Sequence, residues 1–357
     1  MSDPTASDPP IRLKAAEGEY RPKSERSHCA SDEKTGTSGG EGAVVGRFAP
    51  SPSGRMHLGN AFSALMAWLG AKSRGGSMVM RVEDLDPRCQ VPERADTLMD
   101  DLRWLGLSWD GDPVFQSQRQ SAYDEALERL EALEVIYPCF CTRAELHAAS
   151  APHASDGTYV YAGTCRGLSA AEVAARSKLR PPALRAAVPD TDDPAGTVVV
   201  DDLVVGRHVE VLARECGDFI VRRSDRVTAY QLAVVTDDAA MGVTQVVRGR
   251  DLLGSAARQR YLQHLLGLPE VEYAHVPLLV APDGRRLSKR DGDLDLGAIR
   301  ARGTQPETVV GALAAAAGLI DSFEPVAAPD LVERFSWDRL RGRSDIVADK
   351  ALLNRLW

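Results

Sequence analysis

Hydrophobic and polar positions follow two different periods in the first half of the chain. Ala43-Val44-Val45 is a short β-type run that leads into a turn-rich segment, 50–54. The apolar residues that follow recur at spacings that put them on one face of a helix, predicted from about His57 to Ser73. They are Leu58, Phe62, Leu65, Met66 and Leu69. Residues 78–82 suit a buried strand, so the pattern predicts a parallel sheet in an α/β fold.

The middle of the chain changes its pattern twice. Helical periodicity returns at 91–105 and 119–135. Between 137 and 166, cysteines, aromatic residues and loop residues replace the periodic pattern, which indicates a small inserted unit. Two strands are predicted after it, at 197–200 and 203–205, on either side of two aspartates.

The last third of the chain is predicted to complete the sheet and then to become helical. Segments 232–235 and 245–247 are candidates to return to the main sheet. From 307 onward, Ala-rich and Leu-rich segments predict helices. A length of 357 residues is enough for two or three structural units.

Composition narrows the class of protein. Residues 1–42 are rich in Ser, Gly, Pro and charged residues, so they are predicted to be a disordered tail. No apolar run approaches the ~18 residues that cross a bilayer, and no secretory signal is visible, so we expect a cytoplasmic protein that does not enter a membrane. The net charge of −8 argues against a generic nucleic-acid coat but allows a local basic surface that grips a polynucleotide.

One motif lies where the first strand turns into the first helix. The run Arg47-Phe48-Ala49-Pro50-Ser51-Pro52-Ser53-Gly54-Arg55-Met56-His57-Leu58-Gly59-Asn60 combines a glycine-containing turn with a helix start. Such a helix start presents free N–H groups and a partial positive charge to an anion, so the run favours phosphate binding. His-x-Gly alone is more often a capped turn, but the whole run is far more specific.

This run resembles the first signature of class I aminoacyl-tRNA synthetases of the glutamyl type, in which a His-x-Gly-His element holds ATP. Three later motifs follow in that family's order: Arg81-Val82-Glu83-Asp84-Leu85-Asp86, Val247-Arg248-Gly249-Arg250-Asp251-Leu252-Leu253 and Arg286-Leu287-Ser288-Lys289-Arg290. The resemblance covers about residues 44–300. It implies a Rossmann-type catalytic core, ATP as substrate with Mg²⁺, and a mobile lysine loop over the phosphates.

Within this resemblance, His57, Gly59, Asn60, Arg286, Ser288 and Lys289 are the implied ATP-binding residues, and His57 and Lys289 are the implied catalytic ones. Asn60 stands in place of the second histidine; it keeps a donor and an acceptor but cannot become cationic. Arg286 stands in place of the usual leading lysine and preserves positive charge. The basic loop alone would more often be a solvated surface segment.

Glutamate needs arginines for its two carboxylates and an acid for its ammonium group. Arg47, Arg248 and Glu83 supply that set. The resemblance adds contacts from Ser51 with the backbone around it (Phe48, Ala49 and Pro50) and from Tyr230. The alternatives are a surface acid beside Arg81 for Glu83 and a core aromatic residue for Tyr230.

The inserted unit contains Cys139, Cys141 and Cys165, three thiols that need one more ligand for a closed tetrahedral zinc site. From the residues alone, His147 or His153 is the more ordinary fourth ligand; the family pattern implies Tyr161, four residues before the last cysteine. We expect one structural Zn²⁺, with three unligated cysteines as the alternative.

Only 68 residues follow Lys289, too few for the helical anticodon-binding region of a complete glutamyl-tRNA synthetase. The chain therefore resembles the glutamyl-Q tRNA(Asp) synthetase family, whose members activate L-glutamate with ATP and transfer it to queuosine at the wobble position of tRNA(Asp). We expect a monomer. The alternatives are a truncated synthetase that charges the 3′ end of tRNA(Glu), or a tRNA-binding remnant without turnover.

Six segments are predicted from the patterns and motifs together. They are a disordered tail (1–42), the first half of the catalytic domain (43–136), a zinc-binding insert (137–166), the rest of an inserted acceptor-type subdomain (167–228), the second half of the catalytic domain with the lysine loop (229–300) and a helical C-terminal region (301–357).

Overall fold

The computed structural model describes residues 43–148, 160–285 and 295–356. The predicted tail, 1–42, and the lysine loop from Arg286 to Arg290 lie outside these described residues. None of the helices in the described segments is long and apolar enough to span a bilayer.

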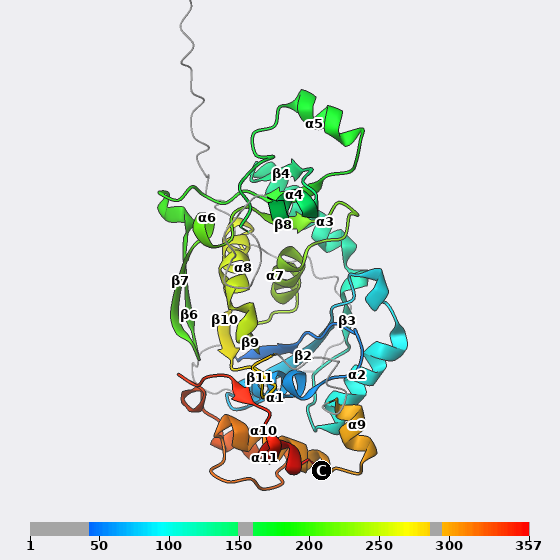
Figure 1. Ribbon diagram of the computed structural model, residues 1–357, viewed down its shortest axis with the longest axis vertical. Helices are drawn as coiled ribbons and strands as arrows, with labels where there is room; N and C mark the ends of the chain where they lie inside the picture. Colours follow the sequence, from blue (N-terminus) through cyan, green and yellow to red (C-terminus); the bar gives the residue numbers. More distant parts are fainter. Residues whose placement is uncertain (1–42, 149–159, 286–294, 357) are drawn as a thin grey trace, which may run out of the picture.

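A mostly parallel sheet forms the centre of the molecule (Figure 1). Strand β1 (Val45–Phe48) pairs in parallel with β2 (Ser77–Val82), and β2 pairs with β3 (Val114–Phe115). On its other edge β1 meets β9 (Gln245–Gly249), where the amide of Thr244 donates to the carbonyl of Val45 at 2.9 Å. Strand β10 (Glu272–Val276) then pairs with β9 and with β6 (Thr197–Asp202), both in parallel, and β7 (Gly206–Val211) closes the edge as an antiparallel hairpin with β6. The predicted α/β fold with a parallel sheet is confirmed.

Helices lie on both sides of this sheet (Figure 1). On one side, α1 (Leu58–Lys72) packs on β1 and β9, and Gly46 permits the close approach because an added Cβ would lie 3.1 Å from the Cβ of Ala71 in α1. On the other side lie α7 (Tyr230–Ala240) and α8 (Leu253–Leu265), which pack together. Helices α2 (Pro92–Trp104) and α3 (Gln120–Ala132) match the two predicted helical segments.

A second, smaller sheet lies at the far end of the molecule from the C-terminal helices (Figure 1). It consists of β4 (Ile136–Cys139), β5 (Ala183–Ala186) and β8 (Phe219–Arg222), all antiparallel. Short helices surround it: α4 (Arg143–Ala148), α5 (Ala170–Ser177) and α6 (Leu212–Glu215). The cysteine cluster has its own small core here, separate from the two large cores.

The C-terminal segment packs beneath the sheet as short helices and one strand. Helices α9 (Leu296–Ala301), α10 (Pro306–Ala317) and α11 (Lys350–Asn354) bury apolar residues such as Leu313 in the core of the first half of the sheet. Two 3₁₀ segments (Ala328–Arg334 and Trp337–Arg339) separate α10 from α11, so the region is less regular than predicted. Strand β12 (Ile346–Val347) pairs with β11 (Leu279–Val280), an element that the sequence patterns did not predict.

Two sequence predictions are wrong in this fold. Residues 203–205 are the turn of the β6–β7 hairpin, not a strand, because Asp202 Oδ1 accepts hydrogen bonds from the amides of Val204 and Val205, each at 2.9 Å. Residues 232–235 are part of α7 and not a return to the sheet. All four are buried, and a short apolar run of this kind fits a buried helix as well as a strand.

Candidate active site

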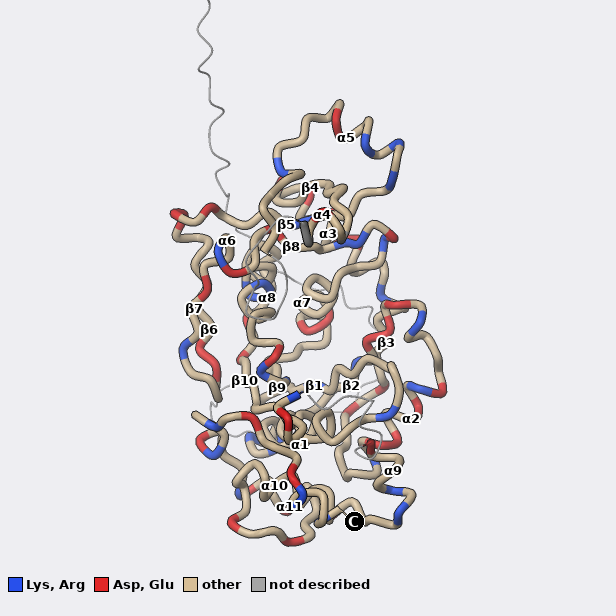
Figure 2. The backbone as a smooth tube through the Cα atoms, in the orientation of Figure 1, with Lys and Arg blue, Asp and Glu red and all other residues tan. Residues whose placement is uncertain are grey.

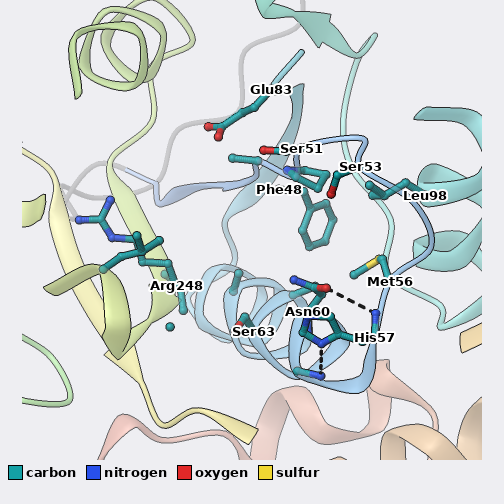
Figure 3. A pocket seen from close by; sticks show the side chains of 18 of the residues that line it. Phe48, Ser51, Ser53, Met56, His57, Asn60, Ser63, Glu83, Leu98 and Arg248 are labelled. Carbon is teal, nitrogen blue, oxygen red and sulfur yellow. Dashed lines mark hydrogen bonds between the residues drawn. The ribbon is translucent and has the colours of Figure 1, made fainter. Parts of the chain in front are cut away.

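A cavity of about 730 Å³ opens above the C-terminal ends of β1, β2 and β9 (Figure 3). In the sheet, β1 lies between β2, which follows it in the chain, and β9, which comes much later. Open α/β sheets bind their ligands at such a point, where the strand order changes direction. Every predicted glutamate- or ATP-binding residue in the described part of the chain lines this cavity. They are Arg47, Phe48, Ala49, Pro50, Ser51, His57, Gly59, Asn60, Glu83, Tyr230 and Arg248.

The N-terminus of α1 forms one end of the cavity (Figure 3). The Nδ1 of His57 accepts from the amides of Gly59 and Asn60 at 3.1 and 3.3 Å, and Asn60 Oδ1 accepts in return from the His57 amide at 3.4 Å. His57 is therefore neutral when it caps the helix, with its proton on Nε2. Asn60, which replaces the family's second histidine, completes this capping box.

An ion-pair cluster lies beside the ends of β1 and β2. Arg81 is fully buried; its guanidinium donates to Asp238 at 2.5 Å and to Glu83 at 3.2 Å. Burial alone would lower the pKa of Arg81, but Asp238 and Glu83 together raise it. Burial raises the pKa of the Glu83 carboxyl above its ordinary value, although Arg81 and Arg47 oppose this shift.

Arg47 reaches the cavity from β1 with incomplete hydrogen bonding. Its Nη1 donates to the carbonyl of Val247 at 3.2 Å, while Nε lies 3.5 Å from Asp238 without a hydrogen bond. Burial lowers the pKa of Arg47 below its ordinary value, and Asp238 opposes the change. An anion that entered here would offset this desolvation.

Arg248, near the end of β9, lines the cavity on a different side from Glu83 and Ser51 (Figure 3). Its Nε donates to His275 Nε2 at 3.0 Å, and its Nη1 donates to Gln259 at 2.8 Å and to the Tyr230 hydroxyl at 3.4 Å. The Nη2 is buried and has no hydrogen-bond partner among the described residues. A side chain held on two of its nitrogens with the third unpaired is suited to bind a carboxylate.

Several residues that hold this site together were missed by sequence reasoning. Asp238 pairs with both Arg47 and Arg81. Asp101, on α2, accepts from Arg55 and from the amide of Met56, so it fixes the loop before His57. Both aspartates lie inside amphipathic helices without a motif, and only their burial distinguishes them from surface acids.

The predicted lysine loop follows β11 in the chain. Arg286, Ser288 and Lys289 lie outside the described residues. The helix after them, α9, begins at Leu296. Leu279 of β11 lines the cavity, and the residue before α9, Asp295, forms a β-bridge with His57. The described residues on either side of the loop therefore lie near the phosphate-binding end.

The three predicted cysteine ligands lie together in the small sheet. The sulfurs of Cys139, Cys141 and Cys165 all lie within 4.8 Å of one another, and the Tyr161 hydroxyl lies 3.5 Å from Cys139 and 3.6 Å from Cys141. Two sulfurs bound to one zinc at about 2.3 Å are separated by roughly 3.8 Å, so this cluster fits the ion. The side chain of His147 and the whole of His153 lie outside the described residues, so the fourth ligand stays a prediction.

The cysteine cluster also contains a buried cation. Arg185 donates to the sulfur of Cys139 at 3.3 Å, and its guanidinium carbon lies 3.7 Å from the centre of the Tyr161 ring. Burial alone would raise the pKa of the Cys139 thiol, but hydrogen bonds from Tyr161 and Arg185 lower it. The thiolate form of Cys139 is therefore easier to reach than that of an ordinary cysteine, at a position where a metal ligand is predicted.

Comparison with known proteins agrees with this architecture. The family described as tRNA synthetases class I (E and Q), catalytic domain, matches residues 43–349, so the fold is that of a class I synthetase catalytic domain. A glutamyl-Q tRNA(Asp) synthetase from Symbiobacterium thermophilum is 48% identical over 83% of this chain and 94% of its own length. A glutamyl-Q tRNA(Asp) synthetase from Nitratidesulfovibrio vulgaris is 45% identical over 88% of this chain and 98% of its own length. The chain belongs to the glutamyl-Q tRNA(Asp) synthetase family.

Solved structures extend the comparison to the fold. A glutamate tRNA ligase from Elizabethkingia meningosepticum, in complex with its amino acid, superposes with a TM-score of 0.74 at 26% identity. The match covers 88% of this chain and 68% of that one. The resemblance predicted from four motifs is confirmed, and the protein is a ligase of the class I type.

Proposed function

We propose that this protein activates L-glutamate with ATP and transfers it to the queuosine base at the wobble position of tRNA(Asp). The observation that carries the first half is the cavity, where a capped helix N-terminus lies opposite two incompletely paired arginines. Support for the acceptor comes from the two bacterial relatives, which are named for this reaction and match over nearly their whole length.

In the first step, an α-carboxylate oxygen of glutamate attacks the α-phosphorus of ATP, and the bond to pyrophosphate breaks. Glutamyl-adenylate and pyrophosphate are the products, so no enzyme nucleophile is needed. Catalysis then requires alignment and stabilisation of negative charge on the phosphate oxygens. We assign this to His57, Gly59 and Asn60 at the helix start, and to Arg286, Ser288 and Lys289, with Mg²⁺ accompanying ATP.

Glutamate recognition is assigned to the opposite end of the cavity. Arg248, with Tyr230, binds one carboxylate, and Arg47 binds the other. Glu83 accepts from the ammonium group, and Ser51 and the backbone of 48–50 form the wall between them. The arrangement matches the three charges of glutamate with opposite charges on three sides.

In the second step, a hydroxyl oxygen of the acceptor attacks the adenylate carbonyl, and AMP leaves as an ester forms. Queuosine carries two neighbouring hydroxyls on its cyclopentene ring, like the ribose at a tRNA 3′ end, so one active site can accept either nucleophile. Exposed basic residues around α5, including Arg176 and Lys178, offer phosphate contacts beyond the cavity (Figure 2).

The cysteine cluster is assigned a structural role. Cys139, Cys141, Cys165 and Tyr161 would hold one Zn²⁺, which would fix the loop after β4 to the segment 161–165. We place the reaction in the cytoplasm, where its substrates occur, and expect a monomer.

Glutamate-dependent ATP–pyrophosphate exchange by the purified protein tests the activation step. We expect exchange with L-glutamate and little with L-aspartate or L-glutamine. A folded protein that binds ATP but gives no exchange, with or without tRNA, would instead be the non-catalytic remnant. Neither that alternative nor a synthetase for tRNA(Glu) is favoured by the relatives.

A further inference from the structure

Behind Arg248, three neighbouring strands bring polar residues into one row across the sheet. In the parallel pair β9–β10, Arg248 lies opposite His275. On the other side of β10, Asp202 is the last residue of β6 and lies opposite Tyr273. Asp202 and His275 are 73 positions apart in the sequence, and of this row only Arg248 belongs to a motif.

Hydrogen bonds connect the row from the buried edge to the cavity. His275 Nδ1 lies 2.6 Å from Asp202 Oδ2, and Arg248 Nε donates to His275 Nε2 at 3.0 Å. A guanidinium nitrogen can only donate, so His275 Nε2 must accept and the ring proton must lie on Nδ1, facing Asp202. His275, and Gln259, which accepts a further bond from Arg248, are both fully buried, so water does not compete for the bonds of this row.

The neutral form of His275 is favoured at physiological pH. Burial and the nearby Arg248 lower the pKa of His275 to about 4, and the hydrogen bond to Asp202 opposes the shift only in part. Burial alone would raise the pKa of Asp202, but bonds from His275 and from the turn amides lower it, which keeps the carboxylate ionised. Tyr273 stacks on the His275 ring, with centroids 5.7 Å apart, and limits its rotation.

This row determines what Arg248 offers to a ligand. Its Nε and Nη1 are occupied by His275 and Gln259, and Nη2 has no hydrogen-bond partner among the residues that the structure describes. The Tyr230 hydroxyl accepts from Arg248, so its own proton can be donated to a ligand. This side of the cavity thus presents donors, which suit both oxygens of a carboxylate but oppose the NH₂ of a carboxamide.

We propose that Asp202 and His275 are positioning residues that set selectivity for glutamate over glutamine, because they hold Arg248, whose guanidinium can only donate, in the orientation that meets the substrate's carboxylate. The inference rests on the proposed assignment of glutamate as the substrate. Neither residue touches the substrate; both act through Arg248.

Asp202→Asn tests this by exchanging one atom. The amide oxygen of the new side chain can keep the bonds to the backbone amides of Val204, Val205 and His275, while an NH₂ replaces Oδ2 and donates to His275 Nδ1. The ring proton then moves to Nε2 and points at the N–H of Arg248. We expect the KM for glutamate to rise about 10- to 100-fold with the KM for ATP within about twofold. The ratio of kcat/KM for glutamate over glutamine should fall by a similar factor.

Two substitutions of His275 separate positioning from general destabilisation, and they also serve if Asp202→Asn does not fold. His275→Gln can still place an acceptor near Arg248 Nε, so it should stay near wild type. His275→Asn can donate to Asp202 but is too short to reach Arg248, so it should match Asp202→Asn. Equal glutamate KM values for the two folded His275 variants would overturn the proposal.

Asp218→Asn is the matched control. Asp218 is a buried aspartate that accepts from the amide of Val188 and from Tyr137 in the smaller sheet, so its substitution should leave glutamate KM unchanged. If wild type shows glutamate-dependent exchange and Asp202→Asn keeps its glutamate KM and selectivity, the inference alone is wrong. If wild type neither binds glutamate in calorimetry nor exchanges with it, the substrate assignment fails and takes the inference with it.

Discussion

At the scale of single residues, the cavity is lined by two arginines whose hydrogen bonding is incomplete. Among the described residues, Arg47 Nε and Arg248 Nη2 are buried without a hydrogen-bond partner. Leaving a buried charged donor without a hydrogen bond costs about 1–3 kcal/mol or more, so both guanidinium groups favour an anionic ligand, although Arg47 Nε also lies 3.5 Å from the Asp238 carboxylate. They lie on different strands, β1 and β9, which suits a substrate with two separate carboxylates.

Arg248→Ala should raise the KM for glutamate about 10- to 100-fold, because one carboxylate loses its cationic partner. ATP binding should change little, since the phosphate-binding helix start lies across the cavity. Steady-state exchange kinetics measure both values. Arg334→Ala, which removes an exposed arginine paired with Glu324, is the control and should behave as wild type. An unchanged glutamate KM in Arg248→Ala would point to a different pocket.

Glu83 should make glutamate binding depend on pH. Burial raises the pKa of this carboxyl, so it becomes protonated at a higher pH than an ordinary glutamate. Because only the ionised form attracts the ammonium group, affinity for glutamate should weaken as pH falls from neutrality through that raised pKa. Titration calorimetry at several pH values, with circular dichroism to verify the fold, measures the effect.

Glu83→Gln is the comparison for this pH dependence. The amide cannot ionise, so the variant should bind glutamate weakly at every pH, and the acid-side loss seen in wild type should disappear. A Glu83→Gln variant with the same pH profile as wild type would assign the titration to another group.

At the scale of elements, the sequence predicted those helices and strands whose signals are local, and it missed a helix, α7, and a turn, 203–205. Helix α1 was expected at His57–Ser73 and is observed at Leu58–Lys72, because its cap and apolar face are both local signals. The turn at 203–205 was missed, because it depends on hydrogen bonds that the Asp202 side chain accepts from the amides of Val204 and Val205, and an apolar run in the sequence does not indicate these bonds. The cavity residues that belong to motifs were found from the sequence. Asp238 and His275 were not, because each is recognised only by a partner that lies on a different element, Arg81 on β2 and Arg248 on β9.

The cysteine cluster gives a prediction at this scale. Purified protein should contain about one zinc per chain, and Cys139→Ser or Cys165→Ser should release it and lower the stability of the small sheet, since metal binding is coupled to local folding. Elemental analysis and thermal unfolding measure the two effects.

Cys216→Ser is the control for the cysteine substitutions. Cys216 is also buried, but its sulfur donates to the carbonyl of Leu212 and lies outside the cluster of three. The Cys216→Ser variant should keep its zinc. Carefully prepared wild type without zinc, or zinc retained in both cluster variants, would contradict the assignment.

At the scale of the whole molecule, the site depends on the order in which strands join the sheet. The chain places β1 between β2 and β9, so residues near 47, 83 and 248 meet at one switch point although about 200 positions separate the first from the last. The resemblance to the family implied that these residues share one pocket, whereas hydrophobic periodicity could not, because periodicity carries no information about which strands become neighbours.

The proposed acceptor concerns the whole protein, because transfer to a wobble base requires that the anticodon loop reach the cavity while the rest of the tRNA lies on the surface. With ATP and labelled glutamate, the protein should label tRNA(Asp) that carries queuosine and leave tRNA(Glu) essentially unlabelled. The reasons are the chemistry of the queuosine diol and the near full-length match to relatives named for this reaction. Anticodon loops expose unpaired bases that proteins can splay into a pocket.

The matched control is tRNA(Asp) without queuosine, which has the same scaffold but lacks the diol on its wobble base. It should remain unlabelled, and nuclease mapping of the modified tRNA should place glutamate in the anticodon loop. Mild periodate treatment oxidises vicinal diols, so it should abolish labelling if queuosine is the acceptor. Periodate also oxidises the diol of the 3′ terminal ribose. A tRNA whose 3′ end is blocked by a phosphate therefore separates labelling of queuosine from labelling of the 3′ end. Labelling that persists on the 3′-blocked tRNA fits queuosine, whereas labelling lost with the 3′ block and mapped to the terminal adenosine would assign the protein to 3′ charging instead.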